Sequence, residues 1–343
     1  MSFKQLEADD FVVSADSISA TLFSGGVPTL TTFFTSSTQE AGSSGDYYLN
    51  VYQTASTLDT AAIQFALTYG NSLGSGSAVF NTAVDGKSPT STIYGQYQNL
   101  VLGDENTDFV FGNITSSEFF AISVDRARYK EKLFLESLTL NISGSAGSLT
   151  LTDNSAYVTS VQFNEAGRVF QLISGSQGVK NTSINADGYT NTSGSYGWLL
   201  PDIGTILLNP HALSTTTGNG GAGFEYSGSI SGSTPVTTSP MASLFQAISG
   251  SSSFRLNSEE TITSDFIFVR PRSSEFNYSE NPSFISGSTG EVLYSDFINN
   301  PQVYVTTVGL YNNSNELLAV AKLSRPLEKD FTKEALVRVK LDF

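Results

Sequence analysis

Short apolar runs, each about the length of one strand, recur along the whole chain between clusters of turn-forming residues. In runs such as 62–69 and 303–311, aromatic and β-branched residues alternate with polar ones. Gly, Pro, Asn and Asp separate the runs and supply the backbone conformations that turns need. Only 14% of the residues are charged, whereas the exposed face of a long helix normally carries Glu, Lys and Arg. The pattern predicts a mainly β protein with antiparallel sheets, sandwich-like subdomains and one or two short helices.

Two segments depart from this rhythm because their apolar residues fall at helical spacing. The first is 88–102, where Pro89 stands at a position suited to the start of a helix and Gly103 to its end. The second is 240–249, where Met, Leu, Phe and Ile form one stripe. We expect a short helix in each.

Shifts in composition suggest three parts. Residues 1–143 are expected to form an N-terminal β-rich domain with the first helix near 89–102, and residues 144–253 a loop-rich middle region. Residues 254–343 are expected to form a C-terminal β domain. Its last part contains three predicted strands, at 303–311, 317–323 and 335–341.

Charge and residue usage exclude several classes of function. The 343 residues carry a net charge of −15, so nucleic acid, whose binding requires clustered Lys and Arg, is not an expected partner. Cys is absent, which excludes disulfides, thiolate catalysis and Cys-ligated metals. A His-centred metal site or a Ser/His/Asp triad would depend on the single histidine, His211. The first ten residues contain no apolar run and no segment approaches the roughly 20 apolar residues of a membrane span, so we expect a cytosolic origin without membrane insertion.

Motifs for catalysis and cofactor binding are incomplete. The segment 86–88 ends like a phosphate-binding loop but lacks its first glycine, and 218–223 fits Gly-x-Gly-x-x-Gly without a strong helix after it. The segment 104–108 begins like a calcium loop, but Phe109 and Thr115 occupy the places of the required Gly and Glu. We expect no enzymatic activity, no catalytic residue, no cofactor and no metal. Paired carboxylates acting as acid and base, and calcium held by loops, stay open as alternatives.

Two groups of basic residues are candidates for a contact surface. The first lies in 125–132, where the charge run favours a solvated turn or a salt-bridged hairpin end, and a docking patch for an acidic neighbour is the alternative. The second lies in 299–343, where charges of both signs accompany the three predicted strands; the alternative is that this segment is the core of the last domain with solvated charges. In either case Lys329 and Lys333 are expected to be exposed, so that their reversal to Glu has little effect on stability. The candidate assembly surface comprises Arg126, Arg128, Lys130, Lys132, Lys322, Arg325, Lys329, Lys333 and Phe343.

Several strings in the sequence are similar to those of a known family. Those in the first half are LTTFFTSS (30–37), QFALTYG (64–70) with GSG (74–76), IYGQY (93–97) and RYKEKL (128–133). Those in the second half are NPSF (281–284), NNPQ (299–302), TVGLYN (307–312), ELLAVAKLS (316–324) and VKLDF (339–343), of which the last three are the most specific. Together they resemble virion structural proteins of contractile-tailed phages, especially those that infect cyanobacteria. The likeness is patchy, spans most of the chain and is weakest in 144–253.

The resemblance implies a non-enzymatic structural component of a phage particle, located in the contractile tail or baseplate, that acts by protein–protein assembly. Its expected partners are other virion proteins and copies of itself, and its expected location is the virion, after synthesis in the host cytoplasm. One alternative is a receptor- or glycan-binding tail protein, including one that hydrolyses glycans, with a site in the loops of 144–253. Another is a neck- or capsid-associated protein. A binder or hydrolase should keep an acidic or aromatic cleft on the monomer, whereas an assembly component should cover its aromatic side chains and order its loops only in contact with neighbours.

Overall fold

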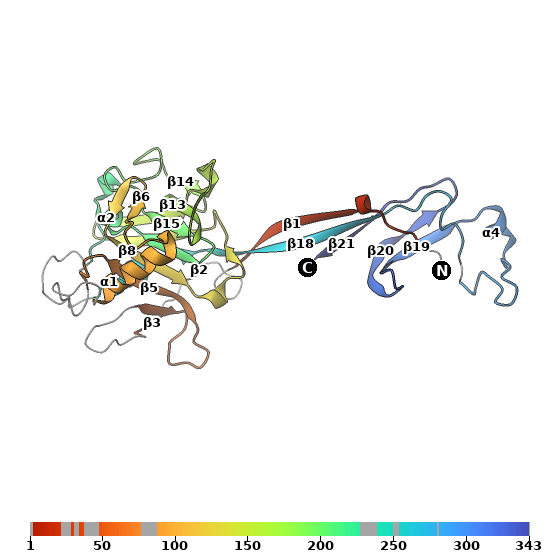
Figure 1. Cartoon of the computed structure of the whole chain (residues 1–343), viewed down its shortest axis with the longest axis horizontal. Helices are drawn as coiled ribbons and strands as arrows, with labels where there is room; N and C mark the ends of the chain where they lie inside the picture. Colours follow the sequence, from red (N-terminus) through yellow and green to blue (C-terminus); the bar gives the residue numbers. More distant parts are fainter. Residues whose placement is uncertain are drawn as a thin grey trace. The chain divides into compact units, whose positions relative to one another are not determined.

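The computed structural model describes residues 3–21, 29–30, 34–37, 48–76, 88–226, 239–249, 254–279 and 281–342. Strands make up 41% of the structure and helices 16%, in antiparallel sheets with few short helices (Figure 1). The predicted mainly β fold is therefore confirmed. The chain divides into two compact units: unit 1 contains Met1–Ser17 and Thr261–Phe343, and unit 2 contains Ile18–Glu260.

These two units differ from the three-part division suggested by composition. The boundary expected after residue 143 falls inside a hairpin, in which β10 (Thr139–Gly144) pairs with β11 (Gly147–Asp153). The polar composition that begins there reflects long loops between strands of one sheet. Unit 1 also includes the start of the chain, because β1 (Phe11–Thr21) lies next to β18 (Asn257–Val269) in one sheet. The boundary expected at 254 lies close to the observed one at Thr261.

Unit 2 is built around one large sheet. Among the described residues its strand order is β2-β17-β10-β11-β13-β15-β16-β8-β5-β4-β3, with β12 and β14 paired to β13, and nine of the strands curl into a half-barrel. Besides β10 and β11, the strands are β2 (Thr29–Leu30), β3 (Phe34–Ser37), β4 (Leu49–Tyr52), β5 (Ile63–Asn71), β8 (Glu118–Val124), β12 (Gln162–Asn164), β13 (Gly167–Ser176), β14 (Val179–Lys180), β15 (Gly197–Leu200), β16 (Thr205–Leu208) and β17 (Phe254–Arg255).

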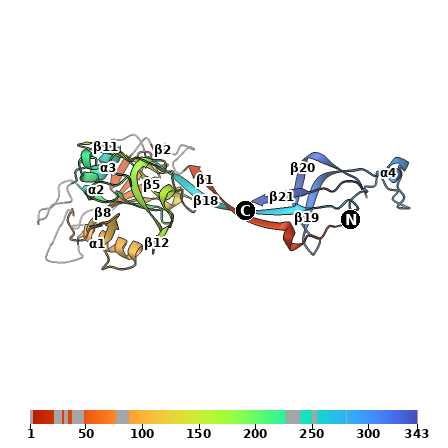
Figure 2. The same ribbon diagram turned by 90° about the horizontal axis from the view of Figure 1, so that it is seen from above.

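Helices cover both faces of this sheet. Along β8, alternation directs Phe120 and Ile122 to one apolar core and Phe119 and Ala121 to the other. Helices α2 (Pro210–Ser214) and α3 (Pro240–Ser249) contribute to the first core, and α1 (Pro89–Tyr97) contributes to the second. Figure 2 shows α2 and α3 on the opposite side of β5 and β8 from α1. Both predicted helices are present, and α1 continues as a π-helical turn, Gln98–Leu102, that ends at Gly103 with a φ of 69°.

The remaining elements of unit 2 are short. A two-stranded hairpin of β6 (Phe109–Phe111) and β7 (Ile114–Ser116) stands beside the large sheet. The strand β9 (Lys132–Leu133) pairs with the first residues of β18. Single 3₁₀ turns occur at Arg126–Arg128, Ser155–Tyr157 and Thr217–Asn219.

Unit 1 contains the rest of β18, flanked by β1 and β21 (Val337–Asp342), and a separate hairpin of β19 (Val303–Tyr311) and β20 (Leu317–Lys329). It also contains the 3₁₀ turn Ala8–Asp10 and the short helix α4 (Ser295–Asn299). The three strands predicted near the C-terminus are all present, and β20 runs six residues beyond the predicted end at 323. None of the helices in the described parts of the chain is both long enough and apolar enough to cross a membrane.

Candidate assembly surface

Unit 1 has a thin apolar core. Among its described residues, the buried hydrophobic side chains are Ile267 on β18, Ala335, and Val337 and Val339 on β21. Side chains of the β19–β20 hairpin, including Leu310, pack against this core but stay only partly buried. A folded domain normally encloses one contiguous core. Unit 1 alone therefore leaves much of its apolar surface in water.

Most of the exposed large apolar side chains of the described chain belong to unit 1, although unit 1 is the smaller unit. On the hairpin, Leu318 is 68% exposed, Tyr304 61% and Val320 58%. Single exposed apolar residues are ordinary, but a large set of them on one unit marks a contact surface. We call this set the unit 1 apolar surface; it comprises Phe3, Phe11, Val12, Val13, Tyr278, Phe284, Leu293, Tyr294, Ile298, Tyr304, Tyr311, Leu317, Leu318, Val320, Phe331 and Leu336.

The β19–β20 hairpin carries apolar side chains on both faces. The cross-strand pair Val308 and Ala321 faces the thin core. The adjacent pair Gly309 and Val320 lies on the opposite, exposed face, where Lys322 extends the same row two residues further. A two-stranded sheet has two open edges and is at best marginally stable by itself. The hairpin therefore has the features of an element whose exposed face and open edges are covered by another protein.

An open groove of about 1490 Å³ runs along the partly buried apolar side chains of unit 1. Its lining includes Phe3 and Leu6 from the N-terminal segment, Val305 and Leu310 from β19, and Leu341 from β21. Phe3 packs edge-on against Tyr311, with 5.2 Å between the ring centroids. The groove is thus an apolar extension of the unit 1 apolar surface.

Lys329 is buried, contrary to expectation. Its side chain is only 1% exposed, and Nζ donates hydrogen bonds to the carbonyl oxygens of Ser273 (3.0 Å) and Asp330 (2.9 Å) and to Oδ1 of Asn277 (2.7 Å). The expectation that this charge is solvated is wrong, because the loop 273–277 folds over the end of β20 and supplies oxygen atoms on several sides of the ammonium. The hydrogen bonds of Lys329 therefore hold this loop against β20.

The other predicted residues of unit 1 are exposed. Lys322 and Arg325 lie on β20 with exposed side chains. Lys333 forms ion pairs with Glu328 (2.6 Å) and Asp330 (3.3 Å), and its hydrogen bonds to these carboxylates raise its pKa. Phe343 lies outside the described residues.

The first basic group lies in unit 2, and most of its side chains bond to other groups of the same unit. Arg126 Nη1 donates to the carbonyl oxygens of Tyr129 (2.7 Å) and Lys130 (2.6 Å), and Arg128 Nε donates to that of Ile63 (3.0 Å). Lys132 forms an ion pair with Glu259 at 3.2 Å, and Lys130 is exposed. These contacts hold the turn against the unit's own backbone. The two basic groups belong to different units, so neither unit by itself joins them into one surface.

The single histidine belongs to a buried carboxylate cluster that the sequence did not reveal. Glu118 on β8 is 3% exposed, and its carboxylate accepts hydrogen bonds from the hydroxyls of Tyr69 and Tyr226 (2.5 Å for Tyr226) and from Nδ2 of Asn71 (3.2 Å). His211 Nε2 lies 3.2 Å from Oε1 of Glu118. Both carboxylate oxygens are thus engaged, and the cluster joins β5, β8 and α2. A Glu at the start of β8, directly before the apolar residues of that strand, is the sequence signal that would have pointed to it.

This cluster makes the stability of unit 2 sensitive to alkaline pH. Burial, and next the charge of Glu118, raise the pKa of Tyr69 and Tyr226 well above the usual 10.0. Above about pH 10 the unfolded chain therefore releases protons that the folded chain retains, and stability falls as pH rises. We expect the melting temperature to fall less steeply between about pH 9 and pH 11 in Tyr226→Phe than in the wild type. Equal slopes for the two proteins would contradict this reading of the cluster.

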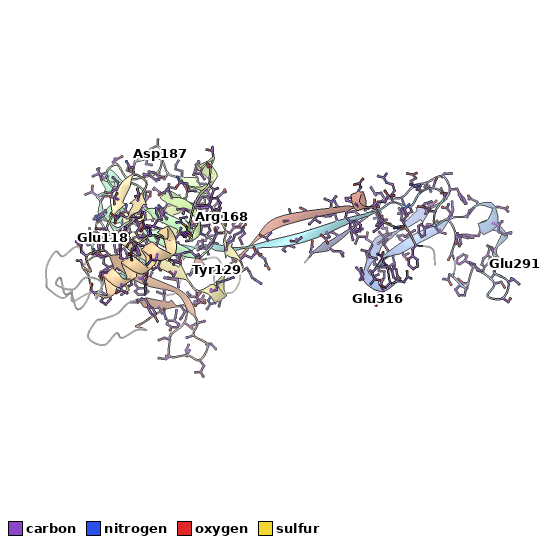
Figure 3. The ribbon with its side chains drawn as sticks, in the orientation of Figure 1. Glu118, Tyr129, Arg168, Asp187, Glu291 and Glu316 are labelled. Carbon is purple, nitrogen blue, oxygen red and sulfur yellow. The ribbon has the colours of Figure 1, made fainter. Side chains whose placement is uncertain are left out.

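Among the described residues, no group of three or more His, Asp or Glu side chains is arranged to hold a metal ion. Figure 3 shows Glu118 within unit 2, apart from the labelled carboxylate of Asp187 on the same unit. No family model, no curated protein and no solved structure matches this chain.

Proposed function

We propose that this protein is a non-enzymatic structural subunit of a phage particle, belonging to the contractile tail or baseplate, and that it works by protein–protein assembly through unit 1. The observation that carries the assembly proposal is the unit 1 apolar surface beside a core of few buried side chains. The resemblance of the strings at 307–312, 316–324 and 339–343 supports the placement in a phage particle.

The exposed apolar area is large enough for a stable interface. A large aromatic side chain buries roughly 150–250 Å² when fully covered. Because many members of the unit 1 apolar surface are about half exposed, together they offer on the order of 1000 Å², whereas a standard interface covers about 800 Å² on each partner. Summed over unit 1, the exposed apolar area therefore equals what a standard interface covers on each partner.

Charges of both signs frame this surface. Lys322 and Arg325 lie on β20, and Glu328 stands opposite Tyr304 in the register of the hairpin. Mixed charges around an apolar centre fix the orientation of a partner more than they add affinity. The same mixture suits other virion proteins and further copies of this chain, which are the partners we propose.

Charged substitutions on the exposed face of the hairpin test the proposal. We expect Leu318→Glu and Val320→Glu, singly and together, to leave the melting of the isolated chain nearly unchanged, since both side chains are more than half exposed. Incorporation into particles, measured by immunoblot of purified virions, should fall at least about tenfold, because each change would bury a charge in the interface.

Leu73→Glu is the matched control, since Leu73 is 79% exposed but belongs to unit 2. This variant should be incorporated normally. Normal incorporation of the double variant at β20 would remove the assembly proposal.

A further inference from the structure

A polar groove of about 740 Å³ lies in unit 2, where several turns meet β13. The β6–β7 turn at 112–114, the segment 154–162 and the loop 185–194 form its walls, and Val169 and Gln171 of β13 contribute to its lining. Its lining side chains are mostly amides and hydroxyls, with one carboxylate, that of Asp187, and neither Lys nor Arg. Figure 3 shows Asp187 at the top of unit 2 in that view.

Three amides of the lining are held in fixed orientations. Oδ1 of Asn154 accepts from the backbone N–H of Gln171 (3.0 Å), and Oδ1 of Asn185 accepts from that of Asp187 (2.8 Å). Oε1 of Gln171 accepts from the hydroxyl of Ser195 (2.6 Å) and the backbone N–H of Gly112 (3.2 Å). Because each oxygen is already used, these contacts determine which end of the amide is the NH₂ group.

The NH₂ groups of these three amides are available to a ligand. Within the described part of the chain, the NH₂ groups of Asn154, Gln171 and Asn185 make no hydrogen bond, and their nitrogen atoms are not among the buried polar atoms that lack a partner. Unpaired donors that are both accessible and oriented favour a ligand rich in acceptors. The groove therefore presents several fixed donors without any positive charge.

The chemistry of the lining selects among classes of ligand. Phosphates and other anions are disfavoured, since there is no Lys or Arg and Asp187 adds a negative charge. A purely apolar ligand would leave the amide donors desolvated and unpaired. A sugar hydroxyl can accept from an amide NH₂ and donate to the Asp187 carboxylate, while a sugar face can stack on the ring of Tyr189. Burial, and next the charge of Asp187, raise the pKa of Tyr189, which keeps its hydroxyl a donor.

We propose that this groove binds a neutral carbohydrate through the NH₂ groups of Asn154, Gln171 and Asn185 and the carboxylate of Asp187. Its volume lies in the range of about 300–1000 Å³ that small-ligand sites occupy. The proposal goes beyond the assembly function, since the site lies in unit 2 and uses no residue of the unit 1 apolar surface.

Two isosteric substitutions each remove one of the three donors and keep the hydrogen bonds that the amide oxygen accepts. In Asn185→Asp the remaining oxygen still accepts from the N–H of Asp187, and in Gln171→Glu it still accepts from Ser195 and Gly112. The matched control is Asn181→Asp, because Oδ1 of Asn181 accepts from the N–H of Ser183 in the same way (3.0 Å) but Asn181 does not line the groove.

Saturation-transfer NMR on the full chain is the test, with glucose, galactose, mannose, N-acetylglucosamine and maltotriose as neutral probes and glucuronic acid and inorganic phosphate as anionic probes. We expect the wild type and Asn181→Asp to bind at least one neutral probe with a Kd below about 10 mM, and both groove variants to bind it at least about tenfold more weakly.

Three outcomes would overturn the proposal: no transfer to any neutral probe, stronger binding of an anionic probe than of every neutral one, or sugar binding that survives in both groove variants. Particle incorporation of the groove variants should stay normal. Loss of the sugar site and failure of the assembly function therefore give different results.

Discussion

Lys329→Glu is expected to unfold unit 1 while unit 2 stays folded. The ammonium of Lys329 is buried and donates to three oxygen atoms, those of Ser273, Asn277 and Asp330. Glutamate would place a carboxylate against these oxygens and leave all of them without a donor. Removing one partner from a buried charged contact costs on the order of 3–5 kcal/mol, which is a large part of the about 5–15 kcal/mol that stabilises a domain.

Hydrogen exchange followed by mass spectrometry separates the two units in this experiment. In Lys329→Glu, peptides from β19, β20 and β21 should exchange as fast as an unfolded chain, while peptides from β8 and β16 keep their protection. Lys333→Glu is the control, since the Lys333 side chain is 47% exposed and the loss of a solvent-screened surface ion pair has little effect on stability. Wild-type protection in Lys329→Glu would show that the buried contact contributes little.

Glu118→Ala should strongly destabilise unit 2. The change leaves the hydroxyls of Tyr69 and Tyr226 without their carboxylate acceptor in a buried site and removes the partner of His211. We expect a loss on the order of 3–5 kcal/mol, which lowers the melting temperature by roughly 10 °C or more for a unit of this size. Glu118→Gln keeps an oxygen acceptor and should lose less.

A double-mutant cycle between positions 118 and 226 measures the contact directly. If the Tyr226 hydroxyl acts through the carboxylate, Glu118→Ala combined with Tyr226→Phe should cost clearly less than the sum of the single changes. Strict additivity in thermal melts followed by near-ultraviolet circular dichroism would mean that the two side chains are not coupled.

Elements with a strong local pattern were predictable from the sequence. The alternation at 303–311 corresponds to β19, and the apolar stripe at 240–249 corresponds to α3. Both were predictable because the spacing of apolar residues within the segment itself reflects which side chains are buried. Strand β15 was not predicted. All four of its residues are buried, so it shows no alternation. Its Trp198 packs edge-on against Phe109 and Phe111 in an apolar core.

Features that depend on distant segments could not be predicted. Unit 1 combines segments from both ends of the chain, and no local sequence pattern predicts that β1 lies beside β18. Lys329 stands in a run of alternating charges that is typical of a solvated strand, and only the loop 273–277 makes it buried. The sequence indicated polar loops in 144–253, but the fixed amides of Asn154, Gln171 and Asn185 meet only after folding.

Electron cryo-microscopy of whole particles that carry this protein tests the account most directly. The account predicts that unit 1 lies against neighbouring protein chains, with the exposed face of the β19–β20 hairpin, including Tyr304, Leu318 and Val320, covered in the interface. Particles that lack the chain, or in which the unit 1 apolar surface faces solvent, would contradict it.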